Sequence, residues 1–335
     1  MKIVLSRLDR VGDLVLSTPA IASVRRSWPQ AEIAIACSQA NAVVLERNPD
    51  IDRIVRLAPG DDPRAFGRRE HGADIAIALA PCAPDFALVG ATRAPLRVGY
   101  TYVRRFVARA TARFFLTRLG ISEADPALCE RDPAYRVRHE VEQVLDLVRL
   151  AGGSARAREL VLPIGEDDRR AVAAVPAQGL AFHLGRRWTS AGSTLASTLE
   201  LLASLRERIR PLVVTYGADG REAAEAIRAS ALADAVAGDV PFGAWAAIFE
   251  KSRLVVTVDT GATHVASAVR RPTVVLFEHR YFRLSSQEWS PYRVPGVCIR
   301  KPAEATPEGL RATRAEIVAA VEELLRAEEP ARTAP

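Results

Sequence analysis

The chain has 335 residues, of which 49% are hydrophobic and 26% charged, and its formal net charge is +6. This composition is typical of a soluble globular protein, and at ~150 residues per domain the length predicts two domains. No apolar run approaches the ~20 residues that a membrane-spanning helix needs, and the N-terminus has neither a long apolar segment nor a small-residue cleavage site. We therefore expect a cytoplasmic protein.

In the first half, short apolar runs alternate with helical patterns, which predicts parallel strands joined by crossover helices. Strands are expected at 2–6, 32–37, 53–57 and 74–79, and helices at 14–28, 40–47 and 139–150. The stretch that follows is rich in proline, glycine, alanine and charge. We predict a first domain at 1–160 and a linker at 161–178.

The second half repeats the alternation and predicts a second sheet. Strands are expected at 179–184 and 211–216, helices near 194–208, 220–230 and 242–251, and a strand, tight turn, helix and strand across 254–277. This domain is expected to span 179–310, followed by a helix at 311–328 and a disordered tail at 329–335. Two facing α/β domains of this kind bind ligands in the cleft where the carboxyl ends of their strands meet.

Cysteine spacing and charge limit the kind of site. The four cysteines, Cys37, Cys82, Cys129 and Cys298, lie far apart with no C-x-x-C pair, so we expect neither a metal site nor a disulfide framework. The net positive charge favours anionic partners. No helix-turn-helix, zinc-finger or RNP pattern is present, so nucleic acid is not expected, and a membrane surface or a phosphorylated substrate fits better.

The loop after the first strand carries Asp13 at the point where the strand gives way to a helix. Gly12 is the only glycine there, so the G-x-G-x-x-G fingerprint of an NAD or FAD site is absent. Asp13 fits two roles. It is either an N-cap that satisfies free N–H groups of the helix or a cleft carboxylate that acts as a general base.

A second candidate site follows the strand at 254–258. A glycine turn that leads into a helix N-terminus directs unpaired N–H groups and the positive end of the helix dipole at one spot, which suits a phosphate. Taken singly, Asp259 also fits a turn residue and His264 a core histidine, but their combination in one turn favours a ligand site. The residues are Asp259, Thr260, Gly261, Ala262, Thr263 and His264.

Two further loops follow strands in the second half. Arg186 and Arg187 come after the strand at 179–184, and guanidinium groups bind phosphate oxygens bidentately, although a solvated pair is the alternative. The loop at 217–222 carries carboxylates that suit a ribose hydroxyl.

A basic aromatic segment occupies 100–115. On a helix, Arg105, Arg109 and Arg113 fall on one face and Phe106 and Phe114 on the adjacent one. This pattern suits docking to a phosphorylated lipid at an anionic membrane surface, and an ordinary amphipathic helix with a solvated face is the alternative.

Motifs spread over nearly the whole chain occur in the order found in one family. They are KIVLSRLDRVGDLVLSTPAIASVRRSWPQAEI at 2–33, ATRAPLRVGY at 91–100, the segment 183–188, GADGRE at 217–222 and VVTVDTGATHVASAVRRPTVVLF at 255–277. Together they resemble the heptosyltransferases of glycosyltransferase family 9, which are lipopolysaccharide core enzymes of Gram-negative bacteria.

The resemblance implies a GT-B fold, in which two Rossmann-like domains face each other across a cleft. The N-terminal domain would bind the acceptor and the C-terminal domain the nucleotide sugar. The implied reaction is a metal-independent, inverting transfer of heptose from ADP-L-glycero-D-manno-heptose to a lipid A or inner-core acceptor, with no cofactor, at the cytoplasmic face of the inner membrane.

The resemblance also assigns residues. Asp13 of the Gly12-Asp13 pair matches the catalytic base, and the D-[ST]-G-x-x-H motif at 259–264 matches the holder of the sugar diphosphate. Arg186, with Arg187 beside it, stands where the family usually has a basic residue two before the tryptophan, and Glu222 matches the acid that binds ribose. For the acceptor we expect Arg10, Gly12, Arg105 and Arg109.

Two departures lie on the donor side. Arg186-Arg187-Trp188-Thr189 stands where the family usually reads K-x-W-P, and Glu278 stands where it tends to have glycine. Two other hypotheses therefore remain. One is a family member that moves another nucleotide sugar onto an O-antigen, capsule or natural-product acceptor, and the other is a catalytically silent GT-B protein that binds a nucleotide or a lipid.

Overall fold

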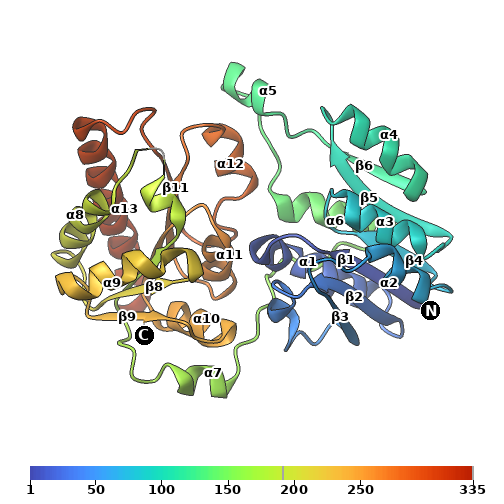
Figure 1. Ribbon diagram of the computed structural model, residues 1–335, viewed down its shortest axis with the longest axis horizontal. Coiled ribbons are helices and arrows are strands. Elements are labelled where there is room, and N and C mark those ends of the chain that lie inside the picture. Colours follow the sequence, from blue (N-terminus) through green and yellow to red (C-terminus); the bar gives the residue numbers. More distant parts are fainter. Residues whose placement is uncertain (191, 334–335) are drawn as a thin grey trace. The chain divides into compact units, whose positions relative to one another are not determined.

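The structure is a computed structural model that describes residues 1–190 and 192–333. The chain forms two compact units, Met1–Pro163 and Ile164–Pro335, each with its own parallel sheet (Figure 1). Two such sheets with flanking helices confirm the predicted α/β class.

The first unit contains a six-stranded sheet in the order β3-β2-β1-β4-β5-β6. Its strands are β1 (Lys2–Arg7), β2 (Glu32–Ser38), β3 (Arg53–Leu57), β4 (Ile75–Ala78), β5 (Leu96–Tyr102) and β6 (Arg118–Ser122). Its helices are α1 (Val11–Ser27), the 3₁₀ helix η1 (Ala42–Leu45), α2 (Pro63–Arg69), α3 (Ala83–Ala91), α4 (Phe106–Phe115), α5 (Pro126–Arg131) and α6 (Glu140–Leu150). β1 lies between β2 and β4, with Leu5 paired with Ile35 and Ile77.

Near-continuous apolar runs form these strands because both faces of the sheet are covered. On one face, Val4 and Ala76 belong to a core cluster with Phe66 of α2 and Phe86 of α3. Ile3, which points to the opposite face, is also fully buried. Helix α1 packs against α6. The sheet therefore holds the carboxyl end of β1 rigidly in the interior of the unit.

The second unit contains a six-stranded sheet in the order β12-β11-β10-β7-β8-β9. Its strands are β7 (Leu180–Leu184), β8 (Leu212–Tyr216), β9 (Ala235–Gly238), β10 (Leu254–Val258), β11 (Thr273–Phe277) and β12 (Gly296–Arg300). Its helices are α7 (Glu166–Ala171), η2 (Arg186–Thr189), α8 (Leu195–Arg206), η3 (Ala218–Gly220), α9 (Arg221–Ser230), α10 (Phe242–Lys251), α11 (Gly261–Ala268), α12 (Phe282–Glu288) and α13 (Pro307–Thr333). Read in reverse, this order is the same as in the first unit.

Helices also cover both faces of the second sheet. Phe182 and Val256 pack in one cluster with Leu201 of α8 and Ile317 of α13, while Val213 packs on the other side with residues of α10. Each fully buried side chain of this size contributes about 1.5–3 kcal/mol relative to exposure. The strands of this unit are therefore covered on both faces, like those of the first.

Several boundaries differ from those expected. The helix expected at 40–47 is only the 3₁₀ turn η1, and the expected linker at 161–178 contains α7, which packs against α10. The C-terminal helix α13 extends beyond the predicted range at both ends, so residues 329–333 of the predicted tail are helical, and 334 and 335 lie outside the described residues. The strands β5, β6, β9 and β12 were not predicted. β6, β9 and β12 are edge strands of four or five residues, and β5, with seven residues, lies next to the edge strand β6.

Candidate functional site

In both sheets the strand order reverses direction between the first strand of the unit and the fourth. These points lie between β1 and β4 and between β7 and β10. Loops at the carboxyl ends of such strands diverge and leave room for a ligand, which is why open α/β sheets bind ligands there. Asp13 follows β1, Arg186 and Arg187 follow β7, and Asp259 follows β10, so these candidates lie at the reversal point of their own unit.

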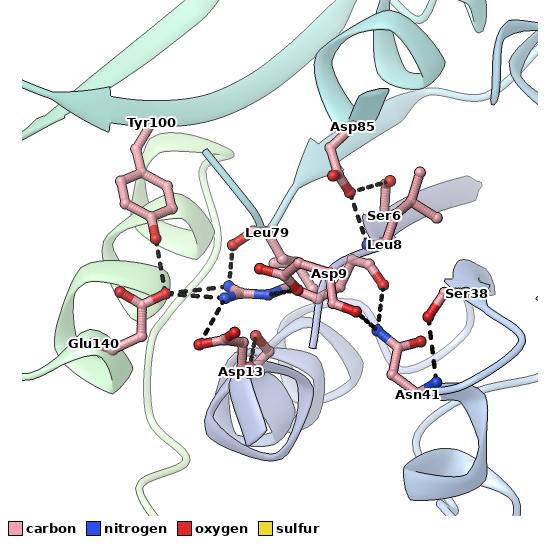
Figure 2. Close-up of polar contacts among 12 residues, drawn as sticks. Ser6, Leu8, Asp9, Asp13, Ser38, Asn41, Leu79, Asp85, Tyr100 and Glu140 are labelled. Atoms are coloured by element: carbon pink, nitrogen blue, oxygen red, sulfur yellow. Dashed lines mark hydrogen bonds and ion pairs between the residues drawn. The ribbon is translucent and has the colours of Figure 1, made fainter. Parts of the chain in front are cut away.

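Arg7, the last residue of β1, organises the reversal point of the first unit (Figure 2). Its side chain is 2% exposed. The guanidinium donates to the carboxylate of Asp9 at 2.8 Å and to the main-chain carbonyl of Leu79, just beyond β4. Both terminal nitrogens also donate to one oxygen of Glu140, each at 3.2 Å. Burial lowers the pKa of Arg7, but the surrounding carboxylates outweigh it and raise that pKa well above its ordinary value, so Arg7 is charged.

Asp13 lies on the first turn of α1 and faces Arg7. The helix begins at Val11 with Arg10 as its N-cap residue, so the structure rules out the N-cap role for Asp13. One carboxylate oxygen lies 3.6 Å from the guanidinium of Arg7, and the side chain is 20% exposed. Burial raises the pKa of Asp13 to about 7, against the opposing effect of Arg7, and the charges of Asp9 and Glu140 raise it further. A carboxylate with this pKa is suited to proton transfer at neutral pH.

Hydrogen bonds fix the loop between Arg7 and Asp13. Asp85 of α3 accepts from the hydroxyl of Ser6 at 2.5 Å and from the N–H of Leu8 at 3.2 Å. Burial raises the pKa of Asp85 to about 7. Asn41 donates its amide to the carbonyls of Arg7 at 3.0 Å and Asp9 at 3.3 Å (Figure 2). Sequence reasoning missed Arg7, Asp85 and Glu140, because only the fold brings these distant segments together.

The other candidates of the first unit fall into two groups. Gly12 is buried beside Asp13 and Arg10 is exposed at the N-cap, so both share the turn of Asp13. Arg105 precedes α4 and lies over the ring of Tyr102 at 4.9 Å, whereas Arg109 lies over Phe106 at 5.6 Å. Arg105 and Arg109 are thus part of the α4 region and make no hydrogen bond to the Asp13 turn among the described residues.

Helix α4 presents a large apolar surface to solvent. Phe106 is 71% exposed, Val107 79% and Phe114 84%, and the exposed side chain of Arg113 lies beside them. Only Ala112 of this helix is fully buried. We call Phe106, Val107, Arg113 and Phe114 the α4 face.

In the second unit, the strand, turn and helix predicted across 254–277 are present as β10, α11 and β11. Thr260 is the N-cap residue of α11, but its hydroxyl donates to the carbonyl of Val258 at 3.3 Å and does not cap the helix. The first-turn N–H groups of Gly261 and Ala262 are thus left uncapped by that side chain, which suits an anion. Thr263 and His264, in contrast, are buried on the inner side of the helix.

Arg187, and not Arg186, contacts the Asp259 turn. Its guanidinium lies 2.5 Å from the carboxylate of Asp259 and also donates to the carbonyl of the same residue. The side chain of Arg186 is exposed, and its backbone N–H donates to Asp219 at 3.0 Å. The family resemblance indicated Arg186, whereas Arg187 is the arginine that pairs with Asp259 in the structure.

Lys301, just beyond β12, supports this arrangement and was missed from the sequence. It is 3% exposed and its ammonium donates to Glu278 at 2.9 Å, to the hydroxyl of Ser190 at 3.0 Å and to the carbonyl of Arg187. A lysine one residue after the short apolar run at 297–299, in a chain otherwise rich in arginine, was the available signal. Glu278, one of the donor-side departures, is therefore the counter-ion of Lys301.

Glu222 is exposed on the first turn of α9, whereas Asp219 of the same loop accepts the N–H of Arg186. Within the described residues, no group of three or more histidine, cysteine, aspartate or glutamate side chains is placed to hold a metal ion. The described helices likewise include none long and apolar enough to cross a bilayer. The two reversal points therefore offer a carboxylate that can accept a proton and a cationic, N–H-rich turn that can bind a phosphate.

Part of the second unit is similar in sequence to a known family. Residues 199–318 match the model of glycosyltransferase family 9 (heptosyltransferase). No curated protein matches the chain in sequence.

Similar solved structures cover both units. A family 9 glycosyltransferase from Veillonella parvula DSM 2008 is 18% identical, with 97% of each chain covered and a TM-score of 0.76. E. coli ADP-heptose lps heptosyltransferase II is 20% identical, with 98% of this chain and 100% of that one covered and a TM-score of 0.73. E. coli heptosyltransferase WaaC with ADP is 17% identical, with 96% and 100% covered and a TM-score of 0.70. These likenesses show the GT-B fold, and residues 199–318 of the second unit are similar to glycosyltransferase family 9 (heptosyltransferase).

Proposed function

We propose that this protein transfers heptose, with inversion, from ADP-L-glycero-D-manno-heptose to a lipid A or inner-core lipopolysaccharide acceptor. The observation that carries the proposal is Asp13, a largely buried carboxylate beside Arg7 with a pKa of about 7. A second carboxylate able to form a covalent glycosyl intermediate is not needed for an inverting transfer, which requires one base and a leaving group on the opposite face.

In the proposed step, Asp13 removes the proton from an acceptor hydroxyl. The oxygen attacks the anomeric carbon, a new glycosidic bond forms, and the bond from that carbon to the diphosphate breaks with its electron pair leaving on ADP. Negative charge grows on the departing phosphate as it leaves. Burial raises the pKa of Asp13 to about 7, which suits this carboxylate to accepting a proton near neutral pH.

The second unit is proposed to bind the donor. The uncapped N–H groups at the start of α11 and the guanidinium of Arg187 would hold the diphosphate and stabilise it as it leaves. This arrangement would stabilise the charge of the leaving diphosphate with groups of the protein itself. Two of the structures similar in fold contain ADP or ADP-2-deoxy-2-fluoro heptose, at 17% identity, which supports an ADP-linked donor.

The acceptor is proposed to reach the first unit from the cytoplasmic side of the inner membrane. The α4 face combines exposed aromatic side chains with arginine, which is the composition of helices that lie in an anionic membrane surface. Arg10 and Gly12 lie in the turn of Asp13 and would contact the acceptor itself.

A second candidate donor has an observation in its favour. Glu278, where the family tends to have glycine, lies next to the Asp259 turn at the end of β11 and is held by Lys301. A carboxylate at this edge of the donor site would accept hydrogen bonds from sugar hydroxyls. The same chemistry with another nucleotide sugar, on an O-antigen, capsule or natural-product acceptor, is therefore the alternative.

The test is a donor screen with the purified full chain. ADP release is measured with ADP-heptose, ADP-glucose, GDP-mannose and UDP-glucose, each with and without a Kdo-lipid A acceptor, and products are identified by mass spectrometry. Acceptor-dependent turnover with ADP-heptose alone supports the main proposal. Turnover with another donor supports the alternative, and binding of ADP-heptose without any transfer would indicate a silent protein.

A further inference from the structure

Glu140 is a buried carboxylate far from Asp13 in sequence. It is the first residue of α6, is 2% exposed and accepts from the Tyr100 hydroxyl at 2.7 Å through the same oxygen that Arg7 contacts. Its other oxygen is buried and has no hydrogen-bond partner among the described residues. A buried carboxylate with one unsatisfied oxygen is a poor way to stabilise a fold, because the desolvation of that oxygen is not compensated.

The position of Glu140 relative to Arg7 suggests another role. One terminal nitrogen of Arg7, Nη2, lies 3.2 Å from Glu140 and 3.6 Å from Asp13 (Figure 2). The two carboxylates therefore share one cationic nitrogen, which lies closer to Glu140. The carbonyl of Leu79 and the carboxylate of Asp9 hold the rest of the guanidinium, so Arg7 has little freedom to move towards either carboxylate.

We propose that Glu140 is a positioning residue, which anchors the Arg7 guanidinium from the side of α6 and so limits how strongly Arg7 pairs with Asp13. Glu140 acts on the transfer through Arg7 and touches neither substrate. Tyr100 supports it by satisfying part of its charge. This role deepens the proposed function and rests on Asp13 being the base.

Charge balance gives the direction of the effect. The charged groups that face Asp13 are Arg7 from β1, Asp9 and Arg10 from the loop and Glu140 from α6. Of these, Arg7 and Arg10 lower the pKa of Asp13, while Asp9 and Glu140 raise it. Without the charge of Glu140, Arg7 is left to pair with Asp13, so Asp13 loses its proton at lower pH and becomes a weaker base.

The test is the pH dependence of kcat/KM for Glu140→Gln in the full chain, with nucleotide sugar and acceptor held constant. We expect the acid limb of the kcat/KM profile to move to lower pH by roughly 0.5–1 unit. This shift is smaller than the 1–3 units by which a charge in direct contact typically changes a pKa. We also expect a lower plateau rate, since a weaker base is a poorer one. The matched control is Tyr100→Phe, which removes the other partner of Glu140 but leaves its charge, and should keep the limb in place.

Other readouts separate a structural role from a positioning role. If Glu140 only stabilises the fold, Glu140→Gln lowers Tm while its acid limb coincides with that of the wild type, and this result overturns the proposal. If Glu140→Gln does not fold, Glu140→Asp retains the charge but draws it back by one methylene, and should give a smaller shift in the same direction. If the acid limb of Glu140→Asp coincides with that of the wild type, this result also overturns the proposal.

Failure of the proposed function would look different. Full activity of Asp13→Ala would remove Asp13 as the base. The influence of Glu140 would still be decided by ¹³C NMR titration of the Asp13 carboxyl, whose midpoint should be lower in Glu140→Gln than in the wild type.

Discussion

The two reversal points share a topology but differ in how their charges are solvated. At the first, Arg7, Asp13 and Glu140 form a network in which two members are 2% exposed. At the second, Arg187 and Asp259 form an ion pair whose side chains are 36% and 22% exposed. Burial makes proton affinity sensitive to each neighbouring charge, whereas partial exposure leaves charges available to a ligand. The same strand order thus places a buried carboxylate network in one unit and a partly exposed ion pair in the other.

Replacing Asp13 should give the largest effect, on turnover and not on nucleotide binding. Asp13→Ala is expected to lower kcat by about 10²–10⁴, the usual contribution of a general base. Binding of ADP, measured by calorimetry, should be unchanged because the proposed donor site lies in the second unit. Wild-type turnover by a folded Asp13→Ala variant would contradict the assignment of the base.

The reciprocal change is Arg187→Ala. Loss of a charge-assisted contact to phosphate should weaken ADP binding by roughly 10- to 100-fold, equivalent to about 1.4–2.8 kcal/mol. The matched control is Arg186→Ala, whose side chain is exposed and whose hydrogen bond to Asp219 is made by the backbone N–H. If Arg186→Ala raises the Kd of ADP more than Arg187→Ala does, Arg187 is not the arginine that binds the diphosphate.

Asp85 tests the energetic cost of burying charge in the first unit. Its folded-state pKa of about 7 lies above the ordinary value of an unfolded aspartate, so the folded protein loses stability as pH rises through that interval. Asp85→Asn removes this dependence and retains an acceptor for Ser6 and Leu8. We expect the variant to gain roughly 1–3 kcal/mol relative to the wild type between pH 5 and pH 8, measured by urea unfolding.

Asp62 is the matched control for that experiment. It is the N-cap of α2, and the N–H of Arg64 lowers its pKa. A group with a lowered pKa loses its stabilising effect only as the pH falls through that pKa. The stability difference between Asp62→Asn and the wild type should therefore stay level from pH 5 to pH 8. If this difference changes with pH as it does for Asp85→Asn, burial of Asp85 is not the cause of the pH dependence.

The α4 face should give the smallest effect on the reaction. Phe106→Ser combined with Phe114→Ser should weaken binding to vesicles containing phosphatidylglycerol by several-fold, because less apolar area enters the interface. Activity on a water-soluble acceptor should not change, since both side chains project into solvent. Equal sedimentation of the variant and the wild type with these vesicles would show that the face is only a solvated helix surface.

The sequence determined the strand, turn and helix across 254–277 and placed Asp13 at the carboxyl end of β1, because hydrophobic periodicity and a glycine turn are local signals. It also indicated the family through motifs in order. It did not determine the N-terminal boundary of α1, so it left the N-cap role of Asp13 open until the structure placed Arg10 there.

Only the tertiary structure decided which charges meet. Glu140 and Arg7 are 133 residues apart, and Lys301 reaches Arg187 across 114 residues. Each pairing depends on two strands or helices being neighbours in the fold, and the sequence carries no local pattern for that. The pKa of Asp13 depends on burial and on charges from distant parts of the chain together, so the sequence could identify the carboxylate but only the packed fold raises its pKa to about 7.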